Sequence, residues 1–86
     1  MYPTTMDLAT RTELIMVHTN EAVSCEWDDA YSRRCVEAIL SIPDGTDLLA
    51  LDAPDEDREI GDGPTAEVDG LTNDQIVSMI IAFHWG

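Results

Sequence analysis

The chain has 86 residues, and its 18 Asp and Glu against four Arg and no Lys give a formal net charge of −14. Nucleic-acid binding needs a basic face and counterion release, so this charge excludes direct binding to nucleic-acid phosphates. It also excludes an anionic membrane surface as a partner. The length indicates one domain over residues 1–86, and the apolar share of 44% is that of a folded globular protein.

The first predicted element covers residues 12–26. Residues 14–17 read LIMV, and four consecutive apolar residues are more typical of a short buried strand than of a surface helix. Thr19-Asn20-Glu21 supplies a turn, after which residues 22–26 return as a second strand. We therefore expect a β-hairpin here, with a helix over residues 5–18 as the alternative.

The pattern over residues 28–42 predicts an amphipathic helix. Its apolar residues cover one broad arc, while Arg33, Arg34 and Glu37 lie mostly opposite. Asp28 or Asp29 caps the start, and the Pro43-Asp44-Gly45 turn ends the helix. Residues 47–52 are a short apolar run between acids, compatible with either a buried strand or a helical turn.

Residues 53–70 are predicted to form an acidic loop. They hold seven acids, one Arg, three Gly and two Pro, and Gly and Pro at this density indicate a loop. A C-terminal helix follows over 73–85, with Thr72 or Asn73 as its cap and a wide apolar face that predicts burial. Together these elements predict a small α+β domain; a mainly α fold of three helices is the alternative.

The sequence contains no pattern typical of a metal-binding or cofactor-binding site. Cys25 and Cys35 are expected to be buried free thiols, and their spacing with His18 and His84 matches no zinc pattern. The acidic run from Asp55 lacks the glycine and the bidentate Glu that a calcium loop needs at its sixth and twelfth positions. We therefore expect neither a metal nor a cofactor.

No catalytic motif is present either. The two histidines lie beside no evident nucleophile, and Gly61-Asp62-Gly63 is flanked by acids that would repel a phosphate. The protein is therefore predicted not to be an enzyme. The N-terminal residues 1–12 have neither a basic start nor an apolar stretch, so we expect a cytoplasmic location.

Charge is the main functional signal, and it is uneven along the chain. Residues 1–42 carry seven acids and three Arg, whereas residues 43–86 carry eleven acids and one Arg. We expect these carboxylates to stand in for phosphates and to bind the basic surface of a nucleic-acid-binding protein. The predicted partner-binding residues are Asp52, Asp55, Glu56, Asp57, Glu59, Asp62, Glu67 and Asp69, with a second patch at Asp28 and Asp29.

In size and charge the chain resembles small acidic inhibitors encoded by phages and mobile elements. Those proteins act against restriction and CRISPR machinery, so the resemblance implies an anti-restriction or anti-CRISPR protein in the cytoplasm of a host cell. The alternative is a salt-adapted regulatory or adaptor domain of a halophile, since eleven of the 18 acids are Asp. Such a domain would dock through an exposed aromatic or apolar patch, with Tyr2, Trp27, Tyr31 and Trp85 as its candidate anchors.

Overall fold

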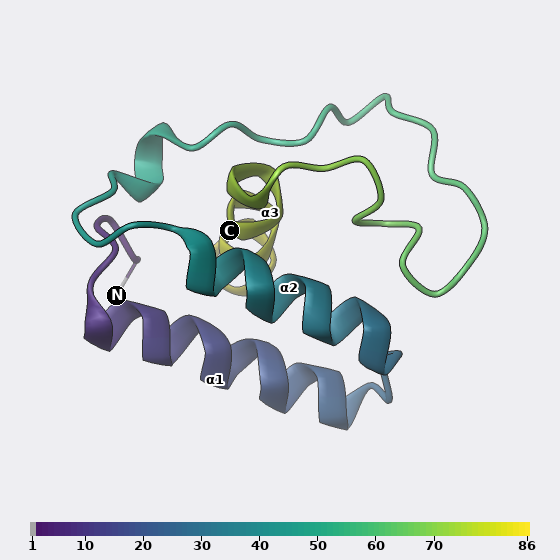
Figure 1. The fold of residues 1–86 in the computed structure, drawn as a ribbon, viewed down its shortest axis with the longest axis horizontal. Helices are drawn as coiled ribbons and strands as arrows, with labels where there is room; N and C mark the ends of the chain where they lie inside the picture. The colour runs from purple at the N-terminus through teal and green to yellow at the C-terminus, as the bar shows by residue number, and fades with distance from the viewer. Residues whose placement is uncertain (1) are drawn as a thin grey trace.

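A computed structural model describes residues 2–86 as three α-helices, α1 (Leu8–Ser24), α2 (Asp29–Ser41) and α3 (Asn73–Trp85), with one short 3-10 helix, Leu48–Ala50. α1 and α2 lie side by side and antiparallel, and α3, which packs against both, is seen almost end-on in Figure 1. No strand forms within residues 2–86, where a single antiparallel bridge joins Thr5 to Asp47. The predicted α+β fold is therefore wrong, and the three-helix alternative fits.

The predicted N-terminal hairpin is the helix α1. Asp7 caps its start by accepting a hydrogen bond from the Thr10 amide at 2.7 Å. Leu14, His18 and Ala22 recur every four residues and are buried, whereas Met16 is 56% exposed. The run of four apolar residues misled the prediction because the helix turns only part of the run inward and leaves Met16 in solvent.

The turn between α1 and α2 holds the two helices in an antiparallel pair. Glu26 takes a left-handed backbone conformation with φ of 54°, and the Trp27 amide donates back to the Ala22 carbonyl at 2.9 Å. Asp28 then caps α2 by accepting from the Ala30 amide at 2.8 Å. The predicted helix over 28–42 is confirmed, with Asp28 and Ile42 as its flanking caps.

The predicted C-terminal helix over 73–85 is also confirmed. Thr72 and Gln75 form a capping box, in which each side chain bonds the backbone amide of the other residue. Ile76, Val77 and Ile80 bury one face of α3 against the α1 and α2 pair. The run over 47–52 contains the 3-10 helix Leu48–Ala50, so of the two alternatives the helical turn is correct. Asp47 caps it, since its carboxylate accepts a hydrogen bond from the Leu49 amide at 3.0 Å.

The N-terminal segment is fastened to the turn that follows α2. Met6 is fully buried, its amide donates to the Thr46 carbonyl at 2.9 Å, and its carbonyl accepts from the Gly45 amide at 2.7 Å. Gly45 has φ of +87°, which a residue with a side chain rarely adopts. This fastening covers one end of the core.

The predicted acidic loop over 53–70 is confirmed as a segment without helix or strand. It leaves the 3-10 helix, passes above the helices and turns back to the start of α3 (Figure 1). Val68 anchors its returning limb in the core with only 2% of its surface exposed. Across residues 2–86, none of the helices has the length and apolar character needed to cross a membrane.

Candidate functional site

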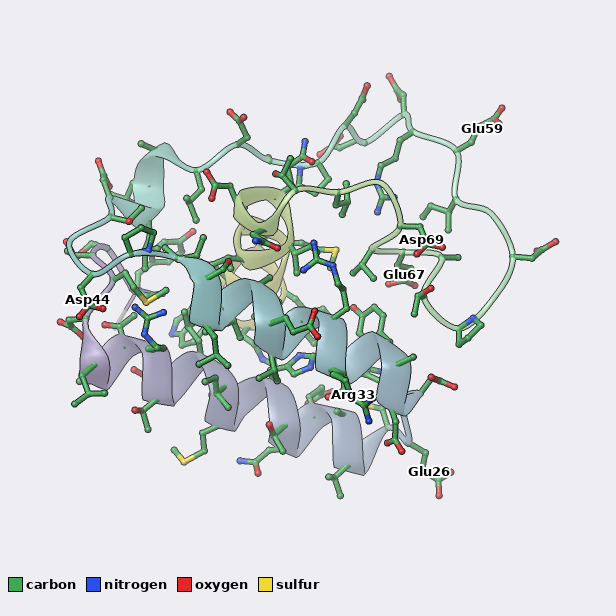
Figure 2. The ribbon with its side chains drawn as sticks, in the orientation of Figure 1. Glu26, Arg33, Asp44, Glu59, Glu67 and Asp69 are labelled. Carbon is green, nitrogen blue, oxygen red and sulfur yellow. The ribbon has the colours of Figure 1, made fainter. Side chains whose placement is uncertain are left out.

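The eight carboxylates predicted in the second half of the chain are all exposed. We call residues 52–69, which contain them, the acidic segment. Glu59 lies at its outer corner and points into solvent, whereas Glu67 and Asp69 lie on the returning limb nearer α2 (Figure 2). The structure thus spreads these carboxylates along an arch. Asp55 and Glu56 line a pocket between this arch and α3, and Glu67 lines a second pocket. An arch of this kind can present charge to the surface of another protein.

Few of the carboxylates in residues 2–86 are neutralised within the protein, and Arg11 with Asp44 is the one ion pair there. Arg11 also donates to the Ile39 and Ile42 carbonyls at 2.7 and 2.8 Å. These are the orphan carbonyls at the end of α2, where a cation also complements the helix dipole. Arg11 therefore fastens α1 to α2 as well as pairing with an acid.

Two further arginines bind polar oxygens instead of carboxylates. Arg34 donates to the Asn73 side chain at 2.7 Å and so links α2 to the start of α3. Arg58 donates to the backbone carbonyl of Glu67 and so joins the two limbs of the acidic segment. These two guanidinium groups therefore form no ion pair with a carboxylate within residues 2–86.

The second predicted patch consists of Asp28 and Asp29, and one of these two residues also stabilises the fold. Both residues are exposed at the start of α2, but the Asp28 carboxylate is the cap of that helix. It is therefore less free to rearrange around a partner than a carboxylate of the acidic segment. Asp55 is similar, since its carboxylate accepts from the Asp57 amide at 3.0 Å.

A pocket of about 340 Å³ opens between the α1–α2 turn, the end of α3 and the returning limb of the acidic segment. We call it the aromatic pocket. Trp27, Tyr31 and Phe83 supply its rings, and His18, His84 and Glu67 supply polar groups. The Trp27 ring lies edge to face against both neighbours, at centroid distances of 5.5 Å to Tyr31 and 5.8 Å to Phe83. Rings arranged in this way form adjoining walls.

Burial shifts the inner histidine of this pocket toward its neutral form. His18 is 1% exposed, and its Nε2 lies 3.1 Å from the Ser32 hydroxyl, so the ring has a hydrogen-bond partner. Desolvation lowers the pKa of His18, and the neighbouring His84 lowers it further. Burial likewise raises the pKa of the Tyr31 phenol, which keeps that group protonated.

The sequence indicated only part of this pocket. Trp27 and Tyr31 were among the four candidate anchors, whereas Tyr2 and Trp85 do not line the pocket. The helix over 73–85 was expected to bury its apolar face, yet Phe83 on this helix is 61% exposed. Aromatic residues just before α2 and at the end of α3 were the available signal, but only the packing of α3 against α1 and α2 places them together.

The cysteines differ from the expectation in one respect. Both are free thiols, but Cys25 is exposed whereas Cys35 is buried. Burial raises the pKa of Cys35 to about 11, and the hydrogen bond to Glu21 raises the pKa of Cys25. Neither thiol is activated as a nucleophile. No cluster of potential metal ligands occurs among the described residues, 2–86.

Comparison with known proteins adds no relative to this description. No family model matches the chain, and no match was found among the curated proteins or among the solved structures.

Proposed function

We propose that this protein is a non-enzymatic inhibitor that occupies the basic, nucleic-acid-binding surface of a partner protein. The observation that carries the proposal is the surplus of exposed carboxylates without internal partners, concentrated in the acidic segment. Phosphates along a nucleic acid attract Arg and Lys by the same long-range field. Carboxylates also accept the bidentate hydrogen bonds that arginine makes with phosphate.

The arrangement of the arginines supports a role for this charge beyond solubility. Arg34 and Arg58 donate to backbone or amide oxygens, and Arg11 does so in addition to its ion pair with Asp44. The fold therefore uses its few cations to hold segments together and leaves the carboxylates of the acidic segment available. Electrostatic association of this kind is fast and depends steeply on salt.

The test begins with capture of partners from host extract at about 50 and 300 mM salt, across which screening of exposed charges rises strongly. A captured nucleic-acid-binding protein is then purified, and its binding to labelled DNA or RNA is measured against increasing amounts of this protein. We expect competitive displacement that weakens at the higher salt. Simultaneous binding of this protein and the nucleic acid would overturn the proposal.

A matched pair of variants separates the acidic segment from overall charge. Glu56, Asp57 and Glu59 are changed to Lys in the test variant, which leaves the Asp55 turn intact. Glu13, Glu26 and Glu37, which are exposed on or beside α1 and α2, are changed to Lys in the control. The two variants have the same net charge, and we expect only the first to lose competition. Equal losses in both would show that the segment is not the binding surface.

A further inference from the structure

We propose that the aromatic pocket binds an alkylammonium group, such as the head of choline or a methylated lysine side chain. The inference goes beyond the proposed function, because it concerns a small cation in a defined cavity and not the exposed carboxylates of the arch. It rests on three observations: the geometry of the rings, the carboxylate in the lining, and the burial and hydrogen bond of the histidine at the floor.

The rings have the geometry that a rounded cation needs. Trp27 meets Tyr31 at an interplanar angle of 77° and Phe83 at 64°. Adjoining walls of this kind present ring faces from more than one direction, and each face attracts a cation through the ring quadrupole. Met79 and Ile80 complete the apolar lining, which suits the methyl groups of an alkylated ammonium.

The pocket has a carboxylate in its lining. Glu67 lines one side, and its carboxylate has no ion-pair partner within residues 2–86. Asp28 and Asp29 are exposed and stand between Trp27 and Tyr31 in the sequence, although neither lines the pocket. No arginine is among the lining residues, although Arg58 lies close by and donates to the backbone carbonyl of Glu67.

The floor of the pocket does not oppose a cation. His18 lies there with its ring almost wholly buried, and burial favours its neutral form. The Ser32 hydroxyl satisfies its Nε2, so the histidine needs no anionic ligand. A neutral or anionic occupant of the same size would gain the apolar contacts but would forgo the attraction of the rings and of Glu67.

The experiment is an NMR titration of the full chain with choline at pH 8, above the ordinary histidine range, at constant ionic strength. The control ligand is 3,3-dimethyl-1-butanol, which has the same shape without the charge. We expect amide shifts at residues 27–31, 63–67 and 83–84, and an affinity for choline roughly tenfold above that for the alcohol. Equal affinities, or shifts confined to residues 52–62, would overturn the proposal.

Two variants locate the binding energy. Glu67→Gln removes one carboxylate and should weaken choline binding about threefold, whereas Asp69→Asn, two residues away and outside the lining, should leave it unchanged. Phe83→Leu keeps an apolar side chain at an exposed position and should weaken binding about threefold or more. Unchanged choline affinity in both Glu67→Gln and Phe83→Leu would refute the assigned site.

A second titration separates the two sources of the ligand. N-acetyl-trimethyllysine amide presents the cation as a protein side chain would, and choline presents it as a free molecule. Tighter binding of the lysine derivative would assign the pocket to a side chain of a partner, and tighter binding of choline would assign it to a free cation. If neither produces shifts in the pocket residues, the proposal is wrong; the competition assay for the acidic segment is decided independently.

Discussion

The helical part of this protein and the acidic segment use their carboxylates in different ways. In the helical part, Asp7 and Asp28 cap helices and Asp44 pairs with Arg11. In the acidic segment, Asp55 stabilises a local turn, and the other seven carboxylates have no hydrogen-bond or ion-pair partner within residues 2–86. Carboxylates with the same charge therefore have different functions in this protein. Some stabilise the fold through hydrogen bonds or an ion pair, whereas others are exposed and form neither with any group of the described residues.

The largest expected effect is in the helical part and concerns Leu14 and Met16. In a strand these residues would point to the same face, but in α1 Leu14 is fully buried and Met16 is 56% exposed. We expect Leu14→Ala to lower the free energy of unfolding by about 2–5 kcal/mol, and Met16→Ala by about 0.5 kcal/mol or less. Urea unfolding measures both values, and similar losses would contradict the helical register.

The next effect concerns the arginine that fastens α1 to α2. Arg11→Met keeps an apolar stem but removes the hydrogen bonds to the Ile39 and Ile42 carbonyls. We expect a loss of about 2 kcal/mol, since bonds that involve a charged group are the stronger ones. Arg33→Met, at an exposed position on the same pair of helices, is the control and should change stability little. A small loss for Arg11→Met would show that its contacts add nothing to stability.

One acid from the helical part and one from the acidic segment should differ in their effect on stability. Asp28→Ala removes the α2 cap and should cost about 1 kcal/mol. Asp57→Ala in the acidic segment removes one of several clustered like charges and should stay within about 0.5 kcal/mol. Thermal unfolding at low salt measures both. Equal destabilisation would remove the distinction between structural and presented carboxylates.

Salt provides a smaller, graded test. Repulsion within the acidic segment should be relieved as salt is added, so the unfolding midpoint should rise and then level off near about 0.2 M, where screening becomes short-ranged. The variant with Glu56, Asp57 and Glu59 changed to Lys should respond less. A midpoint that keeps rising into molar salt would instead favour the salt-adapted domain.

The smallest expected effect is a pH dependence from the buried histidine. The pKa of His18 is lowered in the folded protein by desolvation first and by His84 second. The buried, neutral His18 ring therefore contributes fully to stability at pH values above its pKa in the unfolded chain, about 6.5. This contribution is lost as the pH falls from about 6.5 toward the lower pKa of the folded protein. An NMR titration of the imidazole should give a midpoint below about 6.5; a higher midpoint would contradict the burial of His18.

The sequence predicted the parts that depend on local signals. The caps and apolar faces of residues 28–42 and 73–85 were sufficient to locate α2 and α3. Gly and Pro marked the loop over 53–70 correctly, and each predicted carboxylate is exposed. Composition alone also showed the charge surplus, which needs no structure to be recognised.

Tertiary structure decided the rest, because those features depend on contacts between residues distant in the sequence. Residues 14–17 suit a strand by themselves, and they become helical where packing on α2 and α3 buries Leu14 and leaves Met16 outside. The aromatic pocket likewise needs Trp27, Glu67 and Phe83 to meet from three separate segments. The local sequence pattern indicates secondary-structure propensity and charge. Which side chains become neighbours is determined only by the packing of the folded chain.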